Sequence, residues 1–414
     1  MFLFSALLLL FLCNRAGVVV DPSNILYHET FGYRSLSNNG NVSDKRVDSD
    51  SIFLLASITK TFLAVSAMQL VERNLLELDE EINTYLVRSS LPSIKNPLLV
   101  ASVENKITMR HLLTHTSGVS PKTDSRFYLP YDNYTINTTL REFCFDYLLP
   151  SGKLYSSENW LNVSVGMHYN YSNIGAALAG MVIELISNTS YSKYVEENIL
   201  KPLNMSDASW TLAGLPSTND LVEHYAFNTT LADWLEFAPN LEFRQINESW
   251  IHIGFFGIIP YPAGLLRMSA LSLSKYLRMF INNGTYILKS TSIEQIRTVQ
   301  YPNVSSTSGL IWTYFNFPNR PSYLGHVGIM PGVTTVMVMN PETNIGVIVL
   351  TNADTLNTEQ GTAVNRQMIN IVLYLFDCFE QKMMSAVKSN FSNRNSALIS
   401  IFVLFSQIYY SFIK

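Results

Sequence analysis

A serine and a lysine three residues apart are the first side chains in this sequence that could do chemistry together. Ser57 and Lys60 open a stretch over 57–74 that is apolar on nearly every side, which predicts a buried core helix. On such a helix Lys60 lies one turn after Ser57, on the same face. Partial desolvation lowers the proton affinity of a lysine amine, so the amine can take the proton of a serine hydroxyl. The spacing therefore predicts a serine nucleophile with a lysine base.

The same spacing occurs elsewhere in the chain, so it is not specific by itself. Four further Ser-x-x-Lys pairs are present, at Ser190/Lys193, Ser272/Lys275, Ser385/Lys388 and Ser411/Lys414. For any one pair, a serine that caps a helix and an exposed lysine are the simpler interpretation. The pair that does chemistry can be identified only by the other catalytic groups that a nucleophilic serine requires nearby.

Two other segments could supply those groups. Tyr171 and Asn173 precede an apolar helical pattern over 174–186, and they offer a phenol that relays a proton and an amide that holds an acyl carbonyl. His326 and Gly328 lie in a strand-like run, where they offer a side-chain donor and a backbone that a substrate can approach. Both patterns have rivals, which are Tyr-x-Asn at Tyr131, Tyr301 and Tyr314 and His-x-Gly at His252. We therefore expect the site only where all three segments meet.

Other residues carry weaker signals. His111 and His115 have a spacing that could bind a metal on a helix, but no glutamate follows the first histidine, so we expect no metal and no cofactor. The aromatic stretch over 225–243 either lines a cleft or, more simply, packs in the core. Cys144 and Cys378 could pair in an oxidising compartment, with buried thiols as the default interpretation.

The pattern along the chain predicts the elements that must position these groups. Strand-like runs lie near both ends of the main body, at 17–20, 25–33, 310–315, 323–327, 333–339 and 345–351. Residues 75–304 are mostly helical in pattern, and an amphipathic helix over 362–384 follows the last strand. We therefore predict an α+β fold. An antiparallel sheet flanked by helices comes from about 17–74 and 305–385, and a large helical subdomain is inserted over 75–304.

Composition excludes several functions. The chain of 414 residues has 47% hydrophobic and 14% charged residues, with a formal net charge of −4. Proteins that bind nucleic acid need a basic surface to displace counterions, so we expect no nucleic-acid partner. The hydrophobic content is too high for a disordered chain. A globular enzyme is the class that remains.

Both ends of the chain have patterns typical of the secretory pathway. Residues 1–16 resemble a signal peptide, with a buried terminal helix or strand as the alternative. A polar spacer over 386–396 precedes a hydrophobic tail over 397–414, which directs a GPI anchor, spans a membrane or packs on the core. Twelve Asn-x-Ser/Thr sites favour a glycoprotein. We therefore expect a secreted or cell-surface protein, held at the membrane if the tail anchors it.

In their order along the chain, these segments resemble the serine β-lactamase-related hydrolases, which include class C β-lactamases, D-aminopeptidases, esterases and penicillin-binding proteins. The stretch 53–61 is similar to the strand-to-helix junction that carries the nucleophile in this family. The stretch 107–118 is similar to the family's most recognisable non-catalytic segment. Residues 169–173 resemble the second motif, and 325–352 resemble the third motif with the final hairpin. The resemblance covers roughly residues 17–385.

The resemblance implies a role for each catalytic candidate. Ser57 would be the nucleophile that is acylated, and Lys60 and Tyr171 would be the acid/base pair. The backbone N–H groups of Ser57 and Ile329 would form the oxyanion hole. Asn173 would position the substrate carbonyl. The implied chemistry is acyl transfer to serine and then to water, without a metal or cofactor.

The third motif departs from the common pattern of the family. His326 stands where many relatives carry lysine, next to Gly328 in the strand that binds substrate. A histidine offers only a weaker, conditional positive charge near neutral pH, whereas a lysine there helps to hold the carboxylate of a β-lactam. The resemblance therefore implies a serine hydrolase with a small-molecule or peptide-like acyl substrate, and esterase activity is favoured. The alternatives are a D-aminopeptidase or β-lactamase-type amidase, and a non-catalytic relative that binds or assembles.

Overall fold

The structure is a computed structural model, and it describes residues 15–36, 44–100, 103–122, 124–134, 138–354 and 358–389. The expected hydrophobic tail over 397–414 lies outside these residues, as do most of the expected signal peptide and the end of the expected polar spacer. In the part of the chain that is described, no helix is both long enough and apolar enough to cross a membrane.

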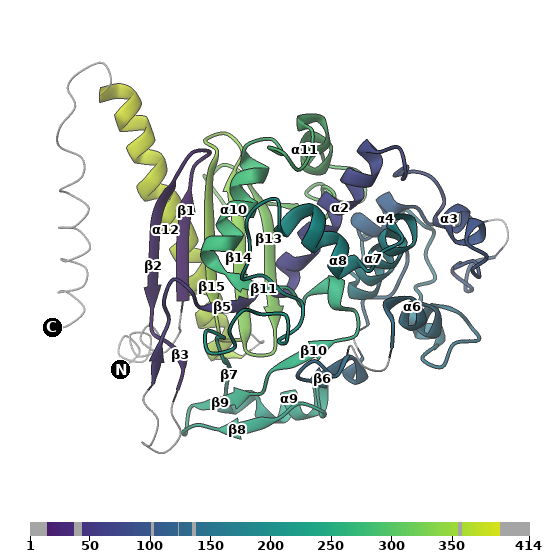
Figure 1. Cartoon of the computed structure of the whole chain (residues 1–414), viewed down its shortest axis with the longest axis horizontal. Coiled ribbons are helices and arrows are strands. Elements are labelled where there is room, and N and C mark those ends of the chain that lie inside the picture. Colours follow the sequence, from purple (N-terminus) through teal and green to yellow (C-terminus); the bar gives the residue numbers. More distant parts are fainter. Residues whose placement is uncertain are drawn as a thin grey trace.

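A six-stranded antiparallel sheet forms one half of the molecule (Figure 1). Its strand order is β12-β13-β14-β15-β1-β2, so the first described strand of the chain pairs with β15. The strands are β12 (Thr313–Phe315), β13 (Tyr323–Met330), β14 (Val333–Asn340), β15 (Ile345–Thr351), β1 (Arg15–Val20) and β2 (Ile25–Phe31). Arg15 and Ala16, which we expected at the end of a signal peptide, therefore belong to the sheet. The predicted α+β class with an antiparallel sheet is confirmed.

Helices cover both faces of the sheet. Side chains alternate along each strand, so apolar residues lie on both faces and each face packs against a helix. Val18 and Val20 of β1 point into the core that the sheet shares with the helical half, whereas Val19 packs on the opposite side. Helix α10 (Ala270–Ile281) contacts β1 and β15, and α12 (Glu359–Ser389) also contacts β15 (Figure 1). Burial on both faces explains why β1 and β15 are almost continuously apolar.

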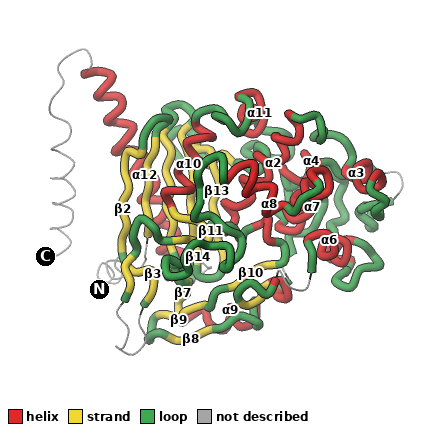
Figure 2. Tube along the Cα trace, viewed as in Figure 1, coloured by secondary structure: helices red, strands yellow, loops and turns green. Residues whose placement is uncertain are grey.

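Helices joined by long loops make up much of the other half of the molecule (Figure 2). They are α2 (Thr61–Glu72), α3 (Ile82–Arg88), α4 (Met109–Leu113), α6 (Leu140–Leu148), α7 (Asn173–Ser187), α8 (Tyr191–Val195), α9 (Leu231–Phe237) and α11 (Ser290–Arg297). Helix α2 is buried from Thr61 to Leu70, as its apolar sequence predicts for a core helix. It packs against α7, so two of the three predicted site segments begin neighbouring helices.

The sequence predicts that the inserted region over 75–304 is mostly helical, and most of the helices given above lie in it. It also contains short strands, which are β6 (Tyr128–Pro130), β7 (His224–Phe227), β8 (Phe243–Gln245), β9 (Trp250–Ile253), β10 (Phe256–Ile258) and β11 (Arg267–Ser269). Strand β11 pairs with β5 (Ile52–Leu54), just before Ser57, and β3 (Tyr33–Ser35) pairs with β4 (Lys45–Arg46). Strands of three or four residues are too short for an alternating pattern to show.

The structure also shows the surroundings of the two cysteines, of His111 and of the aromatic stretch, which carried weaker signals in the sequence. Cys144 is buried and Cys378 is partly exposed, and both are free thiols. Within the described residues, no group of three or more histidine, cysteine or acidic side chains is placed to hold a metal ion. His111 instead caps α4, where its side chain and that of Thr108 satisfy each other's backbone groups. In the aromatic stretch over 225–243, the side chains of Tyr225, Phe227 and Trp234 are buried in the core, whereas Phe237 is 37% exposed.

Candidate active site

Ser57 lies in a tight turn between β5 and α2. The turn is a short 3₁₀ helix over Ala56–Lys60, so Ser57 precedes the α-helix rather than opening it. Ala56 has a left-handed backbone conformation, with φ of +49°, and it is fully buried. This conformation is unfavourable for a residue with a Cβ atom, and it persists only where the surrounding structure imposes it.

Strands β13 and β14 hold this turn in place. A Cβ atom on Gly328 would lie 2.4 Å from Thr335 Oγ1 and 2.5 Å from the backbone oxygen of Leu55. Only glycine therefore lets β13 approach the turn this closely. Thr335 Oγ1 also donates a hydrogen bond of 2.8 Å to the Leu55 oxygen. Gly328, which the sequence placed in the substrate-binding strand, thus has a packing role beside the nucleophile.

The side chain of Lys60 is buried next to Ser57. Lys60 Nζ donates hydrogen bonds to Ser57 Oγ, at 2.9 Å, and to the backbone oxygen of Ala263 in the 3₁₀ turn η6 (Tyr261–Ala263). Burial lowers the pKa of Lys60 well below its usual value, because the charged amine would lose its hydration. The lowered pKa favours the neutral amine, which is the form that can accept the proton of Ser57.

Tyr171 completes a cluster of three polar groups. It precedes Ser172, the N-cap of α7, whose Oγ accepts a hydrogen bond of 3.0 Å from Gly175 N. The side chain of Tyr171 lies next to Ser57, close enough to influence the pKa of the phenol, and Lys60 Nζ lies 5.0 Å from the centre of its ring. Burial raises the pKa of Tyr171 above its usual value, so the phenol keeps its proton near neutral pH. The structure thus brings together the hydroxyl, the amine and the phenol that the sequence singled out.

His326 lies beside this cluster on β13, and it is uncharged. Its ring centre is 6.3 Å from that of Tyr171, and its Nδ1 donates a hydrogen bond of 2.7 Å to the Val327 backbone oxygen. Burial, with a smaller contribution from Lys60, lowers the pKa of His326 to about 3. The conditional positive charge that we expected from the sequence is therefore absent at neutral pH. His326 can still act as a neutral hydrogen-bonding group toward a substrate.

A small cavity of about 40 Å³ opens at Ser57. Asn173 and Ile329 also line it, and Ile329 is 50% exposed, so its side chain lies at the entrance. The remaining lining is mostly apolar and comprises Lys122, Phe127, Tyr128, Ile174, Ile258, Pro260, Ala263 and Met330. A larger cavity of about 500 Å³ lies between α6 and α7, and none of the candidate residues lines it. We place the site in the smaller cavity because Ser57 lines it, and Lys60 and Tyr171 lie directly beside Ser57.

Two contributors to this site escaped the sequence analysis. The Ala263 backbone oxygen binds Lys60 from a position 203 residues away, and a backbone group carries no signal in sequence. His115 was considered as a metal ligand and as part of the non-catalytic stretch 107–118, yet its Nδ1 accepts a hydrogen bond of 3.2 Å from Ser172 N, 57 positions away. Contacts over such separations cannot be read from local spacing.

Acid should destabilise the folded protein through its buried histidines. The pKa values of His115, His224 and His326 are all lowered below the ordinary value, with burial as the largest cause. Below about pH 6.5 these side chains bind protons in the unfolded chain but not in the folded one. Each histidine therefore lowers the free energy of unfolding by about 1.4 kcal/mol per pH unit as the pH falls toward its folded-state pKa.

Urea denaturation at a series of pH values measures this effect. His224 lies away from Ser57, so His224→Phe removes one of the three titrating groups without touching the cluster. The pH dependence of this variant should be shallower by about 1.4 kcal/mol per pH unit. An unfolding free energy that stays constant or increases from about pH 6.5 to pH 4.5 would contradict the neutral burial of these histidines.

Comparison with known proteins assigns the chain to a family. The sequence profile described as Beta-lactamase matches residues 16–367, which is most of the chain. The chain belongs to the beta-lactamase family. Penicillin-binding protein 4* of Bacillus subtilis is 23% identical over 346 residues, which are 82% of this chain and 68% of that protein. Protein flp of Staphylococcus aureus is 22% identical, and the match covers 83% of this chain but only 59% of flp.

Two solved structures of enzymes share the fold of this chain. The D-amino acid amidase from Ochrobactrum anthropi, in its complex with L-phenylalanine amide, superposes with a TM-score of 0.62 at 21% identity. That match covers 85% of this chain and 92% of the amidase. The simvastatin synthase of Aspergillus terreus superposes with a TM-score of 0.61 at 19% identity, over 87% of this chain and 90% of the synthase. Family membership places the chain among the serine hydrolases of this fold.

Proposed function

We propose that this beta-lactamase family member is an esterase that forms an acyl-enzyme on Ser57. The observation that supports this most is the 2.9 Å contact between Ser57 Oγ and the buried amine of Lys60. A buried amine of lowered pKa is a base near neutral pH, and it lies within hydrogen-bond reach of the proton that it must remove. A binding protein has no physical need for this arrangement.

The first half of the proposed reaction acylates the enzyme. Neutral Lys60 takes the proton of Ser57, and the Oγ atom attacks the ester carbonyl. The charge that develops on the carbonyl oxygen is held by the backbone N–H groups of Ser57 and Ile329, two residues that line the same cavity. When the tetrahedral intermediate collapses, the alcohol leaves with a proton from Tyr171, which regains one from Lys60.

The second half hydrolyses the acyl-enzyme. A water molecule gives its proton to the Lys60–Tyr171 pair and attacks the acyl carbon, and the carboxylic acid leaves as Ser57 regains its proton. Asn173 lines the cavity, and we assign it the role of holding the acyl carbonyl in line for both attacks. The two halves consume one ester and one water and need no other reactant.

The cavity favours esters with short acyl groups over β-lactams. Its volume of about 40 Å³ and the Ile329 side chain at its entrance leave room for only a few heavy atoms. His326 is neutral at physiological pH, so it cannot attract the carboxylate of a β-lactam as a charged lysine would. An amidase is the second candidate, supported by the structural match to the D-amino acid amidase.

Hydrolysis of a graded set of esters tests this proposal. We expect kcat/KM for p-nitrophenyl acetate and propionate to exceed that for the octanoate by about tenfold or more, since each poorly accommodated methylene costs about 1 kcal/mol. Ile329→Ala widens the entrance and should reduce this difference, while the retained backbone N–H preserves catalysis. D-amino-acid amides and nitrocefin are assayed in parallel. Faster turnover of the amides supports the amidase, and nitrocefin turnover far above ester turnover overturns the proposal.

A further inference from the structure

His115 contacts the backbone on both sides of Tyr171. The His115 backbone oxygen accepts a hydrogen bond of 2.7 Å from Asn170 N. Its ring Nδ1 accepts one of 3.2 Å from Ser172 N. One residue thus binds the two backbone N–H groups that flank Tyr171, which fixes the direction of the chain where the phenol emerges.

The ring of His115 also packs against the phenol itself. The two ring centres are 4.3 Å apart, and the ring planes are inclined by 41°. Nδ1 accepts a hydrogen bond from a backbone N–H, so the ring proton must be on Nε2, which is buried and has no hydrogen-bond partner among the described atoms. Burial, with contributions from Lys60 and His326, lowers the pKa of His115 well below the usual value. The imidazole therefore stays neutral, and Nδ1 keeps the lone pair that accepts the hydrogen bond from Ser172 N.

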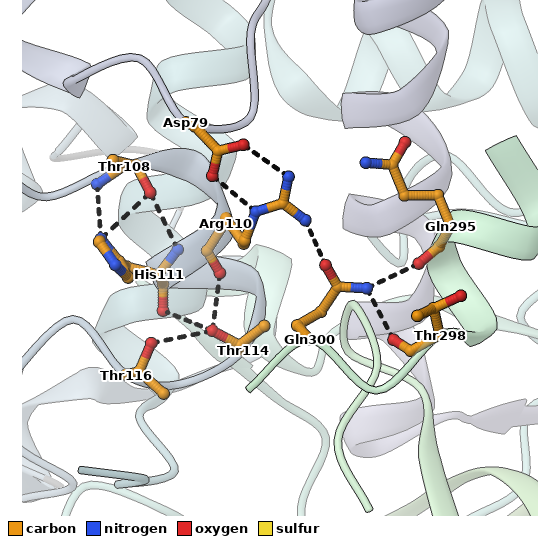
Figure 3. Close-up of polar contacts among 9 residues, drawn as sticks. All are labelled: Asp79, Thr108, Arg110, His111, Thr114, Thr116, Gln295, Thr298 and Gln300. Carbon is orange, nitrogen blue, oxygen red and sulfur yellow. Dashed lines mark hydrogen bonds and ion pairs between the residues drawn. The ribbon is translucent and has the colours of Figure 1, made fainter. Parts of the chain in front are cut away.

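The segment that carries His115 is itself anchored. Figure 3 shows the guanidinium of Arg110 between two side chains. It donates hydrogen bonds of 2.6 and 2.7 Å to the carboxylate of Asp79, and another to the side-chain oxygen of Gln300. The side-chain amide of Gln300 in turn donates to the backbone oxygens of Gln295 and Thr298. In the same view, the Thr114 hydroxyl donates to the Arg110 backbone oxygen at 2.8 Å and lies 2.9 Å from the Thr116 hydroxyl. His115 lies between these two threonines. It is buried and has a left-handed conformation, with φ of +57°.

We propose that His115 is a positioning residue that clamps Tyr171 against Ser57 through the backbone on both sides and through ring packing. This inference rests on the proposed function, in which Tyr171 relays a proton between Lys60 and the leaving group. Proton transfer requires the phenol oxygen to stay within hydrogen-bond reach, and a misplacement of about 1 Å can cost about 100-fold in rate. Lys60 and Ser57 are held independently by α2 and the turn before it, so loosening Tyr171 affects proton transfer more than substrate binding.

Two substitutions at His115 separate positioning from folding. His115→Ala removes the ring and leaves Ser172 N without its acceptor. His115→Asn places a side-chain oxygen near the position of Nδ1, and asparagine tolerates a positive φ, so it keeps part of the clamp. His111→Asn is the matched control, because His111 is in the same segment but caps α4 instead of touching Tyr171.

The experiment measures kcat and KM of each purified full-length variant on the best ester of the wild type, after active enzyme is counted by fluorophosphonate titration. We expect His115→Ala to lower kcat by about 30- to 100-fold with little change in KM. His115→Asn should recover most of this loss. His111→Asn should lower the melting temperature with kcat within about threefold of wild type.

The outcomes distinguish this inference from the proposed function. A kcat for His115→Ala within about threefold of wild type, per active enzyme, overturns the positioning role and leaves the esterase proposal intact. Equal kcat losses in His115→Ala and His115→Asn overturn it as well, since the restored acceptor would then have no effect. If wild-type enzyme neither hydrolyses any ester nor reacts with the fluorophosphonate, the proposed function fails and the inference fails with it.

Discussion

Ser57→Ala is expected to lower the rate of ester hydrolysis by about 10⁴-fold or more. The substitution removes the atom that forms the acyl-enzyme, and loss of a nucleophile from a group that acts as a unit removes nearly all covalent catalysis. Alanine fits the position sterically, because Ser57 is in a turn whose conformation is set by Ala56, Leu55 and β13. Stopped or continuous assays with p-nitrophenyl acetate measure the effect directly.

A second Ser-x-x-Lys pair in the chain provides the control. Ser190 is the N-cap of α8, where its Oγ accepts a hydrogen bond of 3.4 Å from Lys193 N. Ser190→Ala should cost about 1 kcal/mol of stability and leave kcat/KM unchanged. If Ser57→Ala kept more than about a hundredth of the wild-type rate, Ser57 would not be the nucleophile. An equal loss of rate in Ser57→Ala and Ser190→Ala would also contradict this assignment.

Lys60→Met is expected to lower kcat/KM by about 10²- to 10⁴-fold, which is the range for removal of a general base. Methionine is a good replacement for packing, because Lys60 is fully buried and its burial already favours the neutral form. The variant should therefore fold, although it loses the hydrogen bonds to Ser57 Oγ and Ala263 O. Circular dichroism and thermal melts check folding, and ester turnover checks the base.

The pH profile gives a second readout of Lys60. Its pKa is lowered by burial, so the free enzyme gains its base as the pH rises through that lowered pKa. Wild-type kcat/KM should therefore rise with pH to a plateau that is reached well below the usual pKa of lysine. Residual activity of Lys60→Met should lack this rise. Lys193→Met is the matched control, and a loss of the rise in this control rather than in Lys60→Met would contradict the assignment.

Elements with a long, regular pattern could be predicted from the sequence. The strand over Ile345–Thr351 has the bounds that its pattern predicted, and the helix predicted over 174–186 extends one residue further at each end, as Asn173–Ser187. Both are completely or largely apolar on the side that packs on the core, so periodicity and burial agree. The sequence also predicted that Ser57, Lys60, Tyr171 and His326 meet at one site. Their side-chain types left rival motifs open, and the order of the segments, which resembles that of the β-lactamase-related hydrolases, decided between them.

Features that depend on contacts between distant segments could not be predicted. The left-handed Ala56 is imposed by the approach of Gly328 and Thr335, which come from the other end of the chain. The neutral state of His326 follows from its burial next to Lys60, which a strand pattern does not show. The contacts of His115 with the backbone around Tyr171 could not be predicted either, because neither its spacing from His111 nor its place in the stretch 107–118 reveals them.

The most direct measurement is active-site labelling with a fluorophosphonate, followed by proteolysis and mass spectrometry of the purified protein. The arrangement of Ser57, Lys60 and Tyr171 predicts one adduct, on the peptide that contains Ser57, which disappears in Ser57→Ala and persists in Ser190→Ala. An adduct on a different residue, or no adduct in a folded wild-type protein that hydrolyses esters, would contradict catalysis by this serine.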